Sequence, residues 1–100
     1  MKASEVLRKS GDVLRERGWC QGEFDNLSGQ RCALGAIRDF VGNEWVQVAI
    51  PLEVVVGVYP RSVAPWNDVP GRTVDEVLAA MDAAYVLALQ EEGTEPEDVL

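Results

Sequence analysis

Hydrophobic side chains recur at helical spacing over the first seventeen residues. Charged residues take the opposite face of the same segment. Ser4 is a suitable N-cap, and Gly18 is a suitable C-terminal stop. The pattern therefore predicts an amphipathic helix from Ser4 to about Arg17. Its inward face consists of Ala3, Val6, Leu7, Ser10, Val13 and Leu14.

A second apolar stripe ends at Gly42 and predicts a helix from about Cys32 to Val41. Asn43 can cap a short third helix over residues 44–49. The stripe consists of Ala33, Ala36, Ile37, Phe40 and Val41.

Pro51 leaves the secondary structure of residues 45–59 open. Proline is tolerated in the first turn of a helix, so a separate short helix could contain it and end at Gly57. Alternatively, residues 45–50 and 52–59 could be strands, since their valine content favours β-structure.

The strongest local signal is Thr73-Val74-Asp75-Glu76, a capping box with threonine as the cap and glutamate three residues later. It predicts a final helix that runs to about Glu91 and is ended by Gly93. The apolar face of this helix is wide, as in a helix packed on two sides. A second copy of the chain could also contact this face, through Ala80, Ala84 and Leu87. Val86 falls towards the polar side.

The segments between these helices contain turn-forming residues. Residues 25–29 separate two short segments that could pair, which predicts a hairpin-like loop after the first helix. Residues 59–72 hold three prolines and a glycine and are predicted to be a loop. The expected fold class is mainly α: a small single-domain helical bundle over residues 1–93, with an acidic, frayed tail over residues 94–100.

The net charge of −8 is concentrated at the C-terminal end. Residues 1–72 carry nine basic and nine acidic side chains, whereas residues 73–100 carry eight acids and no base. Such a surface repels phosphate, so direct nucleic-acid binding is not expected. It could face a basic protein, mimic a nucleic acid, or only keep the chain soluble. No apolar run has the length of a membrane span, and no secretory signal is evident, so a cytoplasmic location is expected.

Catalytic and metal-binding groups are scarce. The chain has no histidine and two cysteines, Cys20 and Cys32. Two thiols do not complete a zinc site, and a nucleophilic cysteine would lack its usual base. No enzyme activity, metal or cofactor is therefore expected, and no residue is assigned a catalytic role. The thiols are expected to be reduced, although a disulfide is feasible if the intervening segment folds back.

Two tryptophan-centred clusters could form a binding site. A tryptophan beside amides and a carboxylate is typical of a small polar site, but also of a turn that satisfies its own hydrogen bonds. Arg72 could pair with Asp68 across such a turn. The candidate binding or structural residues are Trp19, Cys20, Gln21, Gly22, Cys32, Trp66, Asn67, Asp68, Pro70, Gly71 and Arg72.

These clusters carry a family resemblance. The succession Trp19-Cys20-Gln21-Gly22, Cys32-Ala33-Leu34-Gly35-Ala36 and Trp66-Asn67-Asp68-Val69-Pro70-Gly71-Arg72-Thr73 resembles a family of small uncharacterised proteins of actinobacteria, mycobacteria especially, and their bacteriophages. The resemblance covers about residues 3–90 and implies helices between the motifs. It therefore favours helix around Pro51. It implies a biological context but no activity.

Three functions remain open from the sequence. The first is a non-enzymatic interaction or regulatory protein, encoded by a phage or prophage, that binds a host protein. The second is a small-ligand binding domain built on Trp19 and Trp66-Asn67-Asp68. The third is an acidic mimic of nucleic acid. The compact fold and the ligand pocket both require that the tryptophan motifs meet in space.

Overall fold

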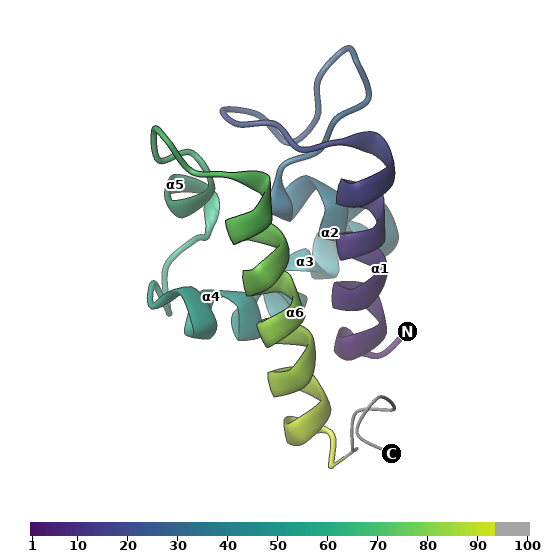
Figure 1. The fold of residues 1–100 in the computed structure, drawn as a ribbon. Coiled ribbons are helices and arrows are strands. Elements are labelled where there is room, and N and C mark those ends of the chain that lie inside the picture. Colours follow the sequence, from purple (N-terminus) through teal and green to yellow (C-terminus); the bar gives the residue numbers. More distant parts are fainter. Residues whose placement is uncertain (94–100) are drawn as a thin grey trace.

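The computed structural model describes residues 1–93, which form a single, mainly helical domain without a β-strand (Figure 1). The predicted fold class is confirmed. The frayed tail predicted over residues 94–100 lies outside the described residues. The helices, in chain order, are α1 (Ala3–Arg17), α2 (Ala33–Val41), the 3-10 turn η1 (Gly42–Glu44), α3 (Trp45–Val48), α4 (Ile50–Val56), α5 (Ala64–Asn67) and α6 (Val74–Glu91).

The long helices α1 and α6 lie side by side and run in opposite directions (Figure 1). Helix α6 also packs against α4, and α1 also packs against α2. The apolar faces of these helices meet in one core, which excludes water from their largest side chains. The fully buried core side chains include Val6, Leu7, Leu14, Leu34, Ile37, Leu52, Val63, Val77 and Met81.

Helix α1 begins slightly earlier than predicted, and Ser4 is not its cap. Lys2 occupies the N-cap position without a capping side-chain bond. Ser4 instead lies inside the helix, where its hydroxyl donates to Glu92 Oε1 at 2.7 Å. Its backbone N–H donates to the other carboxylate oxygen at 3.2 Å. One acidic residue after α6 thus satisfies an N-terminal donor of α1, a partner that local sequence could not indicate.

The predicted second helix is confirmed almost to the residue. Cys32 is its N-cap, and Gly42 ends it with a φ of +56°, a conformation that favours glycine. Asn43, however, lies within η1 and does not cap the next helix. That prediction was wrong because the chain continues directly from α2 through a 3-10 turn into α3.

Residues 50–56 are helical, so the alternative with strands is wrong. Pro51 lies in the first turn of α4, and Gly57 ends the helix with a φ of +81°. Leu52 is fully buried in the core. Packing of this short helix against α6 overrides the β-propensity of its valines, of which Val54 and Val55 remain exposed.

Two further differences concern the C-terminal half. The segment predicted as a loop contains the short helix α5, with Pro65 in its first turn, where proline fits. In addition, Ala84 is fully buried in the core and cannot contact a second copy of the chain. The predicted capping box is confirmed: Thr73 Oγ1 accepts from Glu76 N at 3.2 Å, and Glu76 Oε1 accepts from Thr73 N at 2.9 Å.

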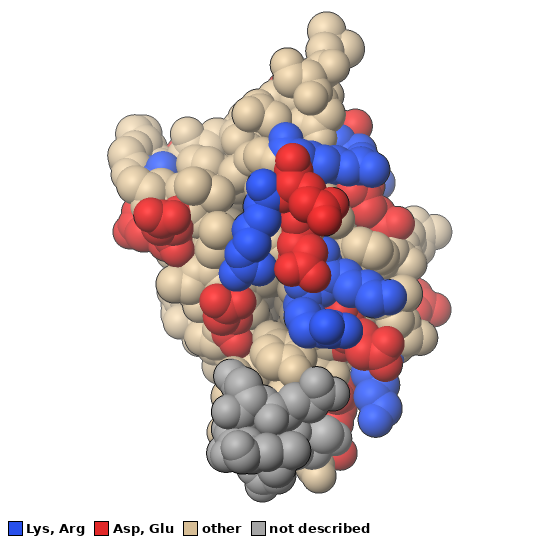
Figure 2. Space-filling model, turned by 45° about the vertical axis from the view of Figure 1, so that its right-hand side comes forward, with Lys and Arg blue, Asp and Glu red and all other residues tan. Residues whose placement is uncertain are grey.

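Basic and acidic side chains are interleaved on the face of the molecule shown in Figure 2. Arg15 of α1 lies 3.4 Å from Asp12 on the same helix and 3.5 Å from Asp82 of α6. These exposed ion pairs contribute little stability, but they neutralise part of the acidity of α6. On this face, the acidic side chain of Asp82 therefore lies beside a basic one.

Candidate functional site

The segment after α1 folds back on itself, as predicted, but through isolated bridges instead of a regular hairpin. Arg31 N donates to Gly18 O at 3.1 Å, and Cys20 N donates to Arg31 O at 3.0 Å. These two bonds form a parallel bridge between Trp19 and Arg31. Residues 19–20 and 31–32 consequently lie side by side.

Asn67, the last residue of α5, joins both tryptophan motifs. Its side chain is 1% exposed and makes four hydrogen bonds. Oδ1 accepts from the indole N–H of Trp19 at 2.7 Å and from Ala33 N at 3.1 Å. Nδ2 donates to Cys20 O at 3.2 Å and to Asp68 Oδ1 at 2.9 Å. All donors and acceptors of this carboxamide are therefore satisfied within the protein.

The carboxamide of Asn67 continues the backbone pairing between the two segments. In a parallel ladder that extended past the Trp19–Arg31 bridge, Ala33 N would donate to Cys20 O. Instead, Asn67 accepts from Ala33 N and donates to Cys20 O. The Asn67 side chain thus supplies the acceptor and the donor that the two segments, which diverge at this point, no longer supply to each other.

A second set of bonds fixes the residues around Asn67. Gln21 Nε2 donates to the carbonyl oxygens of Asn67 at 3.0 Å and of Val69 at 2.9 Å. Asp68 Oδ1 also accepts from Gly22 N at 2.9 Å. Each motif thus supplies the hydrogen-bond partners of the other, and the prediction that they meet in space is confirmed.

Arg72 stabilises the end of this region, but not as predicted. Its guanidinium lies 4.2 Å from the centre of the Trp66 ring, and its Nε donates to Trp66 O at 3.0 Å. A third contact joins its Nη1 to Glu76 Oε2 at 3.3 Å. The expected pair with Asp68 is wrong, because the Asp68 carboxylate turns towards Gly22. Pro70 and Gly71 form the predicted turn, in which Arg72 N donates to Val69 O at 3.0 Å.

Gly35 is a structural residue whose role the sequence did not reveal. The first turn of α2 packs directly against the carbonyl oxygen of Phe24, and a Cβ on Gly35 would overlap that oxygen. The same oxygen accepts from Cys32 N at 3.0 Å. A glycine in the first turn of a predicted helix was the only available signal for this close approach.

The two thiols are free and buried, one at the start of the loop formed by residues 20–24 and the other at the N-cap of α2. Cys20 is 8% exposed and Cys32 is 5% exposed. Cys20 Sγ lies 3.5 Å from Glu23 O, and Cys32 Sγ accepts from Gly35 N at 3.3 Å. Burial raises the pKa of both thiols above the ordinary value of 9.0. They are therefore protonated at neutral pH.

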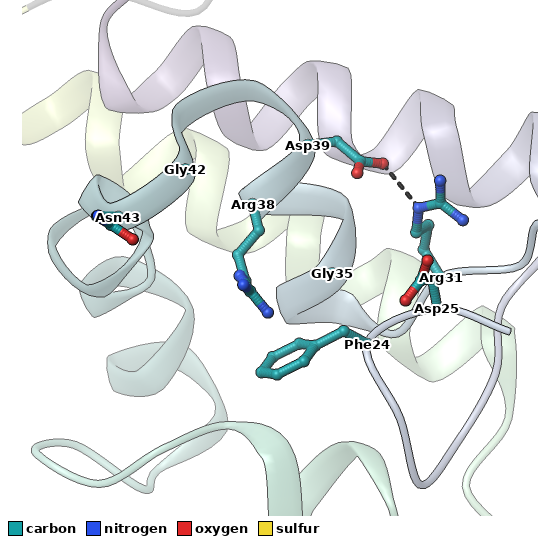
Figure 3. Close-up of a pocket in the computed structure, with 8 residues that line it drawn as sticks. All are labelled: Phe24, Asp25, Arg31, Gly35, Arg38, Asp39, Gly42 and Asn43. Carbon is teal, nitrogen blue, oxygen red and sulfur yellow. Dashed lines mark hydrogen bonds and ion pairs between the residues drawn. The ribbon is translucent and has the colours of Figure 1, made fainter.

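Two hollows flank Phe24, which is 40% exposed. The first has a volume of about 260 Å³ and is shown in Figure 3. There the Arg38 guanidinium covers one face of the Phe24 ring, 4.2 Å from its centre, and Arg31 Nε bonds Asp39 Oδ2 at 2.9 Å. This hollow is lined by Phe24, Asp25, Arg31, Gly35, Arg38, Asp39, Gly42 and Asn43.

The second hollow lies between the same loop and α5. It has a volume of about 430 Å³ and reaches the thiol-bearing residue Cys32. Its lining carries acidic but no basic side chains, and consists of Gly22, Glu23, Phe24, Asp25, Cys32, Ala64 and Asp68.

The chemistry available to this region is limited. Within residues 1–93, no group of three histidine, cysteine or acidic side chains is placed to hold a metal ion. Every fully buried side-chain nitrogen or oxygen atom of these residues has a hydrogen-bond partner. The polar atoms of the motifs are thus used to hold the two segments together, and the hollows beside Phe24 are accessible features next to them.

Fold and site together define a small helical domain closed by two tryptophan motifs that bind each other. Residues 1–86 match a family of unknown function, DUF6197, and the chain belongs to this family. No curated protein and no solved structure matches the chain. Among the described residues, none of the helices combines the length and apolar character required to span a bilayer.

Proposed function

We propose that this chain is a non-enzymatic interaction protein that binds a partner protein through the surface around Phe24. This surface comprises Phe24 and the two hollows beside it. It lies next to the tryptophan motifs, whose bonds hold it in place without using its exposed ring.

The observation that supports this proposal is that the exposed ring of Phe24 is held in one position. The backbone of Phe24 is fixed by Cys32 N, and Gly35 packs against its carbonyl oxygen. The ring lies against the Arg38 guanidinium and packs edge-to-face with Trp45. The two ring centres are 6.4 Å apart, and the ring planes make an angle of 63°. A rigid aromatic side chain loses little conformational entropy on binding, and aromatic residues beside pockets often dominate the affinity of protein interfaces.

The biological context of the proposal comes from the sequence motifs. Their resemblance to proteins of actinobacteria and their phages supports a phage- or prophage-encoded accessory protein. Its partner would then be a host protein in the bacterial cytoplasm. No general acid, general base or nucleophile is required for this role.

The test is a capture experiment with the full chain as bait in a mycobacterial lysate. Phe24→Ala should lose a partner that the wild type retains, because the ring supplies the main apolar contact. Leu27→Ala is the matched control: Leu27 lies three residues further along the connection between α1 and α2 and is fully exposed, but it lines neither hollow. Equal capture by wild type and Phe24→Ala, with both proteins shown to be folded, would contradict the proposal.

Small-ligand binding is the second candidate, and the hollow beside Asp68 favours it. A volume of about 430 Å³ is within the range of small-molecule sites. The ligand would lie beside the motifs, because Trp19, Asn67 and Asp68 bond to one another. A fragment screen by NMR tests this candidate: hits that shift Glu23, Ala64 and Asp68 would support it, and their absence would remove it.

The third hypothesis, a mimic of nucleic acid, has less support. It requires an ordered array of free carboxylates at the C-terminal end. Of the five acids between residues 73 and 93, Glu76 bonds within the capping box, Asp82 pairs with Arg15 and Glu92 bonds Ser4. These three carboxylates contribute to the fold itself.

A further inference from the structure

The two buried thiols are held on adjacent segments whose register is fixed. Cys20 directly follows Trp19, and Cys32 directly follows Arg31, the two residues of the parallel bridge. Side chains alternate along extended segments, so the cysteines share the face opposite to Trp19 and Arg31. Neighbouring segments lie about 4.8 Å apart. Disulfide-bonded cysteines have Cα atoms about 4.4–6.8 Å apart, so the register fits a bond.

The surroundings of the thiols leave room for this bond. Asn67 separates the two segments just beyond the cysteines, where its carboxamide lies between Cys20 O and Ala33 N. Neither thiol is engaged in a strong interaction: Cys20 Sγ contacts Glu23 O, and Cys32 Sγ accepts one backbone N–H.

One of the two cysteines also borders a hollow in the surface. Cys32 lines the 430 Å³ hollow between the 20–24 loop and α5, whereas Cys20 does not line it. Both residues are nearly buried, with Cys20 8% and Cys32 5% exposed, so the hollow beside Cys32 is what assigns it the first attack.

We propose that Cys20 and Cys32 form a redox-active pair that closes to an intramolecular disulfide with a low-molecular-weight disulfide such as oxidised glutathione. Cys32, as thiolate, attacks one sulfur of the small disulfide, whose S–S bond breaks and releases one thiolate. Cys20, as thiolate, then attacks Cys32 Sγ and displaces the second small thiol. Two protein thiols lose their protons and are oxidised, and one small disulfide is reduced to two thiols. This inference is independent of the proposed function.

The consequence for the fold is a covalent link across the first motif. The bond would join the segments that Asn67 connects by hydrogen bonds. If folding favours formation of the disulfide, then by linkage the disulfide stabilises the folded state. The oxidised chain should therefore melt at a higher temperature than the reduced chain.

The test is equilibration of the full chain with reduced and oxidised glutathione at alkaline pH, followed by acid quenching and intact mass measurement. The folded wild type should lose two hydrogen masses and remain a monomer. Because two cysteines so close in sequence also pair in an unfolded chain, the equilibrium constant is measured with and without urea. Folding should raise it at least tenfold, as expected if the structure brings the thiols together.

Cys20→Ser is the informative variant. It should stop at a single glutathione adduct on Cys32, because the displacing thiol is missing. For the wild type, an equilibrium constant no larger in the folded than in the unfolded chain would overturn the proposal. Stable glutathione adducts on both cysteines, a disulfide between two chains, or no reaction would overturn it as well.

Discussion

At the scale of single residues, the structure depends most on Asn67. A buried carboxamide costs free energy unless all its donors and acceptors are paired, and here four bonds achieve this. Aspartate has nearly the same shape but would lack the donor to Cys20 O. Serine would be too short to span the two segments. Asparagine is therefore required at this position by geometry and by hydrogen-bond capacity together.

The first prediction follows from this requirement. Asn67→Ala should lower the free energy of unfolding by about 3–5 kcal/mol, because it removes four hydrogen bonds and leaves buried backbone groups unpaired. Urea denaturation followed by circular dichroism measures this change. Asn43→Ala, at an exposed position in η1, is the control and should stay within about 0.5 kcal/mol of the wild type. Similar losses for both variants would show that Asn67 has no special role.

At the scale of elements, helix contacts are set by small residues as well as by large ones. Gly35 allows the first turn of α2 to approach the loop at Phe24, and Gly11 lies in the middle of α1 near Met81 of α6. Both glycines are in helices, yet their surroundings differ. A Cβ on Gly11 would lie 3.3 Å from Arg15 Nη1, the end of a flexible side chain, and 3.7 Å from Met81 Cγ.

The second prediction compares these two glycines. Gly35→Ala should destabilise the protein by about 2–3 kcal/mol, because the added methyl group forces the backbone of α2 away from Phe24 O. Gly11→Ala should instead be neutral or stabilise by up to about 1 kcal/mol through helix propensity. Both changes are read from thermal and urea unfolding. Equal effects would mean that helix propensity, and not packing against Phe24, determines the change in stability at Gly35.

The third prediction concerns the start of α6. Thr73→Ala removes the side-chain acceptor for Glu76 N and should cost about 1 kcal/mol, the usual effect of losing a helix cap. Because α6 contacts both α1 and α4, unfolding should remain a single transition at a lower denaturant midpoint. Hydrogen exchange in which only the amides of α6 lose protection would contradict this coupling.

At the scale of the whole molecule, two carboxyl groups give opposite contributions to the dependence of stability on pH. The bond from Thr73 N to Glu76 lowers the pKa of the Glu76 carboxyl, so its stabilisation is present above the ordinary value of 4.5 and is lost as the pH falls through the folded pKa. Glu53 is 7% exposed, and burial raises the pKa of its carboxyl. Its charged form is therefore unfavourable in the folded state once the pH exceeds that raised pKa.

The fourth prediction uses this difference in sign. At neutral pH, Glu53→Gln should raise the melting temperature and Glu76→Gln should lower it. The difference for Glu53→Gln should shrink as the pH falls through the raised folded pKa towards 4.5. The difference for Glu76→Gln should persist to 4.5 and shrink only below it, as the pH falls through the lowered folded pKa. Differential scanning calorimetry across this pH range measures them. A change of the same sign for both variants would contradict the assigned environments.

Local signals predicted much of this fold, and distant contacts account for the errors. The start of α6 could be predicted because Thr73 and Glu76 interact within four residues. The partner of Ser4, by contrast, is Glu92, and 88 positions separate them. The motifs identified Asn67 and Trp19 as relevant, but their bond spans 48 positions, so the sequence could not decide between a ligand site and an internal connection.

The carboxamide of Asn67 has a further consequence for the solution behaviour of the protein. Cys20 O and Ala33 N belong to segments that end their pairing at this point, and Asn67 covers both groups. Without it, these two groups would face each other across a gap with no hydrogen-bond partner, and water could reach them. Asn67 thus also shields a backbone amide from solvent: in Asn67→Ala, the amide hydrogen of Ala33 should exchange with deuterated water faster than in the wild type, a difference that NMR would detect.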